Sequence, residues 1–306
     1  MKQILIANGK LKASNIAAGC MRISEMTDKE ADAFLNTCIE SGINLFDHAD
    51  IYAKGNAEKV FGKALKRNKD LREKIILQTK CGIVPGVMFD FSKKHIVASL
   101  EGSLKRLGVD AVDILLLHRP DTLVEPQEVE AAFTELFKDG KVKHFGVSNQ
   151  NPSQMRFLQK NLSFELKINQ LQFSAAHTGM VDAGLYVNTK MSGAVDYDGG
   201  ILEYCREHNV TIQAWSPFMY GFFDGVFIGS KKYPELNKCL NELAKKYNST
   251  PSGIATAFIL RHPANMQVIT GTTKPDRIRE ICAASEIYLD RKDWYTVWQS
   301  AGNPLI

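Results

Sequence analysis

The chain lacks the features that mark several large classes of protein. Its six cysteines are widely spaced and form no Cys-x-x-Cys pair, which is typical of reduced thiols rather than of a disulfide framework or a zinc site. No stretch approaches the ~18 uncharged apolar residues of a membrane span, and the first residues do not resemble a secretion signal. We therefore expect a cytoplasmic protein that does not bind a membrane.

Strong charge of one sign is also absent. The 306 residues include 38 Lys and Arg against 34 Asp and Glu, a net charge of +4. This balance gives no indication of a nucleic-acid partner, although a small anionic ligand is compatible with it. Hydrophobic residues make up 44% of the chain, and no Pro-, Gly- or Ser-rich linker divides it. We therefore expect a single domain over residues 1–306.

Short β-branched segments alternate with amphipathic segments along the chain, which predicts an α/β fold with parallel strands. Eight such units close best into a (β/α)8 TIM barrel, with residues 1–11 as a hairpin at its bottom. The expected strands are 16–20, 43–46, 75–79, 112–117, 143–147, 168–172, 211–215 and 267–270. The expected helices are 28–41, 56–67, 92–106, 125–138, 152–160, 199–208, 235–247, 252–262 and 275–284.

A doubly wound open sheet is the alternative fold. No Gly-x-Gly-x-x-Gly sequence follows an expected strand, so the usual dinucleotide fingerprint of that fold is missing. Two connections, 173–198 and 216–234, are too long for plain turns, and such loops are usually functional or disordered. The second suits either a substrate pocket or a small core of its own, because it is rich in aromatic residues. These are Phe218, Tyr220, Phe222, Phe223 and Phe227.

An ionisable side chain directly follows each of three successive expected strands. Asp47, Lys80 and His118 each follow an apolar strand segment, and Tyr52 comes five positions after Asp47. The carboxyl ends of barrel strands meet on one face, where catalytic residues collect. Taken singly, a Tyr, an Asp or a His in such a place is more often structural. Their shared placement favours a catalytic site.

The neighbours of Tyr52 predict how it would handle a proton. Lys80, at the end of an apolar strand, is expected to be partly desolvated and paired with Asp47. A phenol beside an ammonium has its anionic form favoured, so we expect the pKa of Tyr52 to be lowered toward neutral pH. Tyr52 would then give or take a proton, and His118 would hydrogen-bond a substrate oxygen.

Several segments of the chain, nearly from end to end, resemble those of the aldo-keto reductase superfamily. Residues 42–62, which contain Tyr52, resemble its first signature. Residues 113–118 resemble its second signature and residues 140–149 its third. Residues 269–277 are similar to its cofactor clamp. The motifs occur in the family's order and at compatible spacing.

The resemblance implies a barrel that binds a nicotinamide cofactor in extended form without the Rossmann glycines. It also implies that Tyr52 is the proton donor, that Asp47 and Lys80 tune it, and that His118 orients the carbonyl group of a small-molecule substrate. One local departure is that residues 53–56 are Ala-Lys-Gly-Asn where Gly-x-Ser is common. This difference affects a loop and a helix cap and leaves the four residues intact.

The resemblance extends the cofactor site to the later strand ends. Ser148, Asn149 and Gln170 would bind the nicotinamide carboxamide, and Trp215 would stack on the ring. Ser148 and Asn149 could instead cap the next helix, and Trp215 could be a core residue. The expected cofactor residues are Met21, Asp47, Ser148, Asn149, Gln170, Trp215, Ser216, Pro217, Gly271, Thr272, Thr273, Lys274 and Arg277.

The clamp favours NADPH/NADP+ as the cofactor. Lys274 and Arg277 flank the start of a helix begun by Pro275, where backbone N–H groups and two cations suit a phosphate. The ribose 2′-phosphate therefore fits better than a bare 2′-hydroxyl. Asp276 could bind such a hydroxyl, which keeps NADH as the alternative.

Two other functions are weighed against a reductase. A barrel metallohydrolase would use His48, Asp50, His118 and His177, but His48 has no His-x-His partner nearby. A redox-sensing subunit would hold the cofactor, bind a partner protein and turn over very slowly. The sequence does not fix the oligomeric state, and a monomer is compatible with it.

Overall fold

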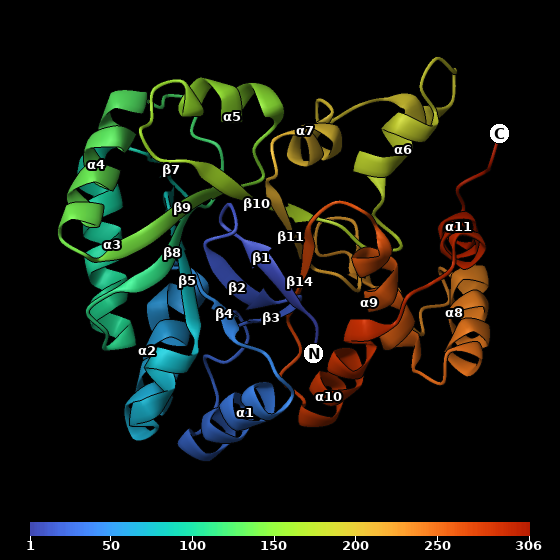
Figure 1. Ribbon diagram of the computed structural model, residues 1–306, viewed down its shortest axis with the longest axis horizontal. Coiled ribbons are helices and arrows are strands. Elements are labelled where there is room, and N and C mark those ends of the chain that lie inside the picture. The colour runs from blue at the N-terminus through green and yellow to red at the C-terminus, as the bar shows by residue number, and fades with distance from the viewer.

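The computed structural model describes residues 1–306, except for the side chain of Lys69. Eight parallel strands close into a barrel and follow one another around it in chain order (Figure 1). The fold is the predicted TIM barrel. Its strands are β3 (Ile16–Gly19), β4 (Leu45–Asp47), β5 (Ile76–Cys81), β8 (Val112–Leu117), β9 (Val142–Ser148), β10 (Leu166–Gln172), β11 (Thr211–Trp215) and β14 (Met266–Thr270).

Helices surround the barrel and cover its outer face (Figure 1). Several begin at the expected caps: the side chain of Thr27 accepts from the N–H of Glu30 in a capping box, and that of Ser92 accepts from the N–H of His95. None of the described helices is long and apolar enough to cross a membrane. The predicted helices correspond to α1 (Asp28–Glu40), α2 (Asn56–Arg67), α3 (Lys93–Leu107), α4 (Pro126–Lys138), α5 (Pro152–Gln159), α7 (Ile201–Glu207), α8 (Pro234–Lys246), α9 (Pro251–Arg261) and α10 (Pro275–Ala283).

A buried apolar cluster joins the barrel interior to the hairpin that precedes the first barrel strand. This hairpin of β1 (Gln3–Ile6) and β2 (Leu11–Ser14) extends three residues beyond the predicted 1–11. Its Ile6 and Ala13 pack in one buried cluster with strand residues such as Leu45. The hairpin therefore closes the amino-terminal end of the barrel. The cavity described below opens at the opposite, carboxyl-terminal end.

The structure contains elements that the sequence analysis did not predict. Helix α6 (Gly179–Leu185) lies within the first long connection, and α11 (Arg291–Ser300) follows the last expected helix. Trp298 of α11 donates its indole N–H to Asp182 of α6 at 2.8 Å, which joins the two additions. Small hairpins also decorate the loops: β6 (Ile83–Val84) with β7 (Met88–Phe89), and β12 (Met219–Tyr220) with β13 (Gly225–Val226).

Candidate active site

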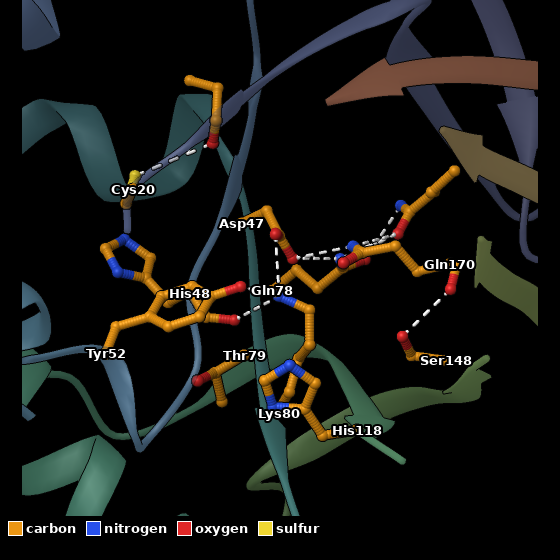
Figure 2. A network of polar contacts seen from close by, with 12 residues as sticks. Cys20, Asp47, His48, Tyr52, Gln78, Thr79, Lys80, His118, Ser148 and Gln170 are labelled. Carbon is orange, nitrogen blue, oxygen red and sulfur yellow. Dashed lines mark hydrogen bonds and ion pairs between the residues drawn. The ribbon is translucent and has the colours of Figure 1, made fainter. Parts of the chain in front are cut away.

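A cavity of about 590 Å³ opens at the carboxyl-terminal face of the barrel. Its lining includes Asp47, Tyr52 and His118, three of the four residues expected to be catalytic. Lys80, the fourth residue, is fully buried and donates a hydrogen bond to the Tyr52 hydroxyl. The structure therefore brings the four predicted residues together, and Figure 2 shows the Lys80 side chain reaching between Asp47 and Tyr52.

The ammonium group of Lys80 has three acceptors around it. It donates to Asp47 Oδ2 at 2.7 Å, to the backbone oxygen of His48 at 2.8 Å and to the Tyr52 hydroxyl at 3.1 Å. An ammonium has three N–H donors, so each is used. Lys80 lies within β5, which runs one residue farther to Cys81. Its side chain is consequently fixed by a strand and by a complete set of hydrogen bonds.

The charges of Lys80 and Tyr52 respond to burial in different ways. Burial opposes the Lys80 ammonium, but the Asp47 carboxylate and the Tyr52 oxygen outweigh it and raise the pKa of Lys80. Burial also raises the pKa of Tyr52 above its ordinary value, and Lys80 only partly counteracts this. The prediction of a lowered pKa for Tyr52 is therefore wrong for the protein without ligands, because it considered the cation and neglected desolvation. Tyr52 holds its proton at neutral pH.

His118 is neutral in this environment. Burial, together with the positive charges of Lys80 and Arg119, lowers the pKa of its ring well below the ordinary value. The ring lies edge-on to Tyr52, with 6.0 Å between centroids. Its Nδ1 has no hydrogen-bond partner among the described residues. Because the neutral ring also lines the cavity beside a protonated phenol, an accessible ring nitrogen can bind a substrate oxygen or hydroxyl.

Asp47 rests on a network of buried glutamines that the sequence analysis missed. Gln78 donates to Asp47 Oδ1 at 2.5 Å, and Gln170 donates to the same oxygen at 3.1 Å. Gln213 links the two by accepting from both, and it donates on to Gln267 at 2.9 Å. The carboxylate is thus held by amides on one oxygen and by Lys80 on the other. Gln170, expected to contact the cofactor, is therefore also a support for Asp47.

The loop that carries Tyr52 has an unusual backbone. Ala53 and Lys54 adopt left-handed conformations, with φ of 48° and 55°, and Gly55 follows at 83°. A left-handed conformation costs an L-residue roughly 1–2 kcal/mol. The departure from Gly-x-Ser in residues 53–56 therefore places an alanine where glycine is favoured. This loop must be held in place by its surroundings.

A buried ion pair provides that support. Glu58, fully buried at the start of α2, accepts from Arg106 Nε and from the Thr79 hydroxyl, both at 2.7 Å. The Arg106 side chain passes so close to Gly55 that an added Cβ would lie 2.6 Å from its Cδ. These contacts tie the Tyr52 loop to α3 and β5. Glu58 and Arg106 belong to the structure of the site although they lie outside the cavity lining.

Most of the expected cofactor residues line the same cavity. Trp215 donates its indole N–H to Asn149 Oδ1 at 3.1 Å, and Asn149 donates to the Ser148 hydroxyl at 2.7 Å. Ser148 in turn donates to the backbone oxygen of Gln170. Asn149 caps no helix: the cap of α5 is Asn151. Also in the lining are Met21, Ser216, Pro217, Gly271, Thr272 and Arg277.

The clamp residues lie where α10 begins. Lys274 is the N-cap residue, Pro275 opens the helix, and Arg277 reaches the cavity. Thr273 directly precedes the cap. Asp276, the acidic alternative, is exposed and forms an ion pair with Arg279 at 3.1 Å. The two cations thus flank a helix start, as the sequence predicted.

The aromatic loop 216–234 contributes side chains both to the cavity and to the main core, rather than forming a small core of its own. Phe223 stacks on Trp215 with 5.9 Å between centroids, and Phe222 lies edge-on to the same indole at 6.3 Å. Both line the cavity mouth and are exposed. Phe227, in contrast, is fully buried in the main core. One part of the loop shapes the cavity and another anchors it.

Comparison with known proteins identifies the family. The family model described as Aldo/keto reductase family matches residues 15–301. The chain belongs to this family. It is 33% identical to a 6-dehydroglucose reductase of Agrobacterium fabrum, over 98% of each chain. It is 30% identical to a 6-dehydroglucose reductase of Novosphingobium aromaticivorans, covering 97% of this chain and 94% of that one. Family membership supports an oxidoreductase that uses a nicotinamide cofactor on small carbonyl compounds.

A solved structure shares the fold. It is an aldo/keto reductase from Klebsiella pneumoniae in complex with NADP and acetate, with a TM-score of 0.78 and 22% identity. The match covers 100% of this chain and 97% of that one. The barrel and its surrounding helices are therefore shared with this oxidoreductase.

The residues considered for a metallohydrolase are not arranged for a metal. Within the part of the chain that the structure describes, no group of three His, Cys, Asp or Glu side chains could hold a metal ion. His48 is fully buried and packs its ring against Phe61 at 4.5 Å. His48 directly follows β4 in the sequence, and its side chain lies in the core.

Proposed function

We propose that this protein reduces an aldehyde or ketone to an alcohol with NADPH, with Tyr52 as the proton donor. The observation that carries the proposal is the contact of a protonated Tyr52 with Lys80 inside a cavity that also contains the neutral ring of His118. A phenol that holds its proton at neutral pH is suited to donate it once negative charge develops on a carbonyl oxygen.

The cavity residues fit a nicotinamide cofactor with a 2′-phosphate. Lys274 and Arg277 form no ion pair with any described residue, and they flank the start of α10, whose first N–H groups lack helical acceptors. Trp215 offers an aromatic face, and Asn149 and Ser148 offer amide and hydroxyl groups. When bound, NADPH would supply the hydride that reduces the carbonyl carbon.

The protein's own groups would handle the oxygen and its proton. His118 and Tyr52 would bind the carbonyl oxygen and fix its position. As the oxygen gains charge, the Tyr52 proton would pass to it, and the phenolate left behind would lie 3.1 Å from the Lys80 ammonium. Asp47 would keep Lys80 charged and in place. This arrangement stabilises the charge that develops in the transition state.

A screen of carbonyl compounds for loss of NADPH absorbance tests the proposal. The panel should include aromatic aldehydes, 2-oxo aldehydes and sugar aldehydes, the last because two relatives bear the name 6-dehydroglucose reductase. Turnover that needs NADPH and survives a chelator supports a reductase. Tightly retained NADPH with no turnover on any compound would favour the redox-sensing subunit instead.

We also infer that the protein works in the cytoplasm. All six cysteines are buried and free. Such thiols persist in a reducing compartment, where NADPH is also available. Labelling of the thiols only after unfolding, in protein extracted under alkylating conditions, would support this location.

A further inference from the structure

An arginine lines the cavity next to His118. Arg119 follows His118 directly and is partly buried. Its guanidinium carbon lies 5.8 Å from the centroid of the Trp215 ring and 5.4 Å from that of Phe222. Arg119 is therefore held between aromatic side chains in the lining of the cavity, next in sequence to His118.

Arg119 has no acidic partner among the residues that the structure describes. Some other arginines of the chain are paired, for example Arg67 with Asp32 and Arg106 with Glu58. The acidic residue nearest to Arg119 along the chain is Asp121, which accepts the backbone N–H groups of Phe91 and Leu123 instead. Asp47, inside the cavity, is engaged by Lys80 and the glutamines.

The charge of Arg119 is unfavourable in this place because its guanidinium is partly buried and has no anionic partner. Burial lowers the pKa of Arg119, with only Tyr52 acting in the opposite direction. Cation–π contacts with Trp215 and Phe222 offset part of the lost hydration, but an aromatic face offers no hydrogen-bond acceptor. A guanidinium is best matched by a carboxylate or a phosphate, which accept two parallel N–H bonds. The missing acceptor is therefore an anion.

We propose that Arg119 binds an anionic group of the carbonyl substrate. The inference rests on the proposed reductase function and narrows the substrate to aldehydes or ketones that carry a carboxylate or a phosphate. His118 and Tyr52 hold the carbonyl oxygen, and Arg119 holds the charged end of the same molecule. Arg119 thus determines specificity and takes no part in proton or hydride transfer.

Matched pairs of substrates isolate the charge. 3-Carboxybenzaldehyde and 4-carboxybenzaldehyde are compared with their methyl esters, and glyceraldehyde 3-phosphate is compared with glyceraldehyde. For at least one pair, the anionic member should have a kcat/KM about tenfold or more above its neutral analogue, because a charge-assisted pair is typically that strong. The pair with the larger ratio distinguishes a carboxylate from a phosphate.

Variants then assign the preference to Arg119. Arg119→Gln should lower kcat/KM for the preferred anionic substrate by about tenfold or more and change that for the neutral analogue by less than about threefold. Arg119→Lys should keep part of the preference. Arg22→Gln removes the same charge from an exposed residue at the rim and should leave the anionic-to-neutral ratio near that of the wild type.

Other results would overturn the inference. Neutral analogues reduced as well as the anions would show that no anion subsite exists, while the reductase function would stand. Equal losses for both members of a pair in Arg119→Gln, or weaker NADPH binding in that variant, would assign Arg119 to catalysis or to the cofactor. If Arg22→Gln lowered the anionic-to-neutral ratio of kcat/KM as much as Arg119→Gln, the preference would come from the positive electrostatic potential of the cavity rim rather than from Arg119. Failure to reduce any compound would instead contradict the proposed function itself.

Discussion

The Lys80 ammonium lies 3.1 Å from the Tyr52 hydroxyl, although the two residues are 28 positions apart. Strand β5 brings the lysine to this place, and the loop after β4 brings the tyrosine. The same ammonium binds Asp47 at 2.7 Å. Tyr52 therefore lies beside a cation that is itself paired with a buried carboxylate.

Replacing Lys80 should move the pH dependence of catalysis. Burial raises the pKa of Tyr52 and Lys80 counteracts this, so Lys80→Met should raise that pKa further. Oxidation of an alcohol needs the phenolate as a base, so its rate rises with pH and the rise should shift upward by about one unit or more in the variant. The measurement is kcat for oxidation across the alkaline range. Lys80→Arg, which keeps the cation, serves as the control, and an identical profile in Lys80→Met would count against the pairing.

The clamp cations should determine the choice of cofactor. Charge-assisted contacts contribute about 1.5–3 kcal/mol each, so Lys274→Ala with Arg277→Ala should weaken NADPH by roughly a hundredfold or more. NADH makes no 2′-phosphate contact and should bind almost unchanged. Titration by quenching of tryptophan fluorescence measures both cofactors.

A matched control removes the same charge elsewhere. Arg291→Ala with Lys292→Ala changes two exposed cations on α11 and should leave both affinities unaltered. If the unmodified protein binds NADH as tightly as NADPH, or if the clamp variant weakens both equally, the 2′-phosphate assignment is wrong and the reductase assignment survives.

Breaking the ion pair beneath the Tyr52 loop should destabilise the protein. Glu58→Gln leaves Arg106 without its carboxylate, and loss of one partner of a buried pair costs about 3–5 kcal/mol. Arg106 is partly exposed, so we expect roughly 3 kcal/mol, the lower end of that range. Urea unfolding measures it. Lys93→Gln breaks a surface pair with Glu135 and should cost less than about 1 kcal/mol. Equal losses of unfolding free energy in the two variants would show that the buried Glu58–Arg106 pair stabilises the protein no more than a surface pair does.

Burial of His48 predicts a loss of stability in acid. Burial and the nearby Lys80 lower the pKa of His48 to about 3. The unfolded chain takes up this proton near the ordinary value of about 6.5, so the contribution of His48 is present above that pH and is lost as the pH falls toward 3. The expected loss between about pH 6.5 and pH 5 is roughly 2 kcal/mol, at 1.36 kcal/mol per unit.

A variant isolates this effect. Neither ring nitrogen of His48 has a partner among the described residues, so His48→Met breaks no hydrogen bond. Its free energy of unfolding should fall about 2 kcal/mol less than that of the wild type over the same interval. Asp50, whose pKa burial raises to about 7, changes stability in the opposite sense in both proteins and cancels. His208→Gln, at an exposed position, is the control. Parallel curves for wild type and His48→Met would contradict the prediction.

The barrel, and the meeting of the expected catalytic residues at one of its faces, were predictable because both follow from the pattern of strands along the sequence. Asp47, Lys80 and His118 each end or nearly end an apolar strand, and strand ends share one face in any parallel barrel. The support for Asp47 was not predictable in this way. Gln78 and Gln213 lie within strands, where alternating polar residues usually face solvent, and only closure of the barrel buries them.

Other features could not be predicted because they depend on which residues surround a side chain in the folded protein. The direction of the Tyr52 pKa depends on the degree of burial, which a sequence does not give. Arg119 has an apolar strand and His118 before it, but its lack of a partner is visible only in the fold. For α11, a signal was present: Asp290 caps the helix by accepting from the N–H of Asp293.

The most direct test of the central proposal is the rate of carbonyl reduction by Tyr52→Phe. This change removes one hydroxyl and keeps the ring beside His118 and Lys80. We predict that kcat for NADPH-dependent reduction falls by at least about a hundredfold, while the dissociation constant of NADPH changes by less than about threefold. Tyr197→Phe, at an exposed side chain, should keep full activity. Near-normal turnover by Tyr52→Phe would show that another group donates the proton.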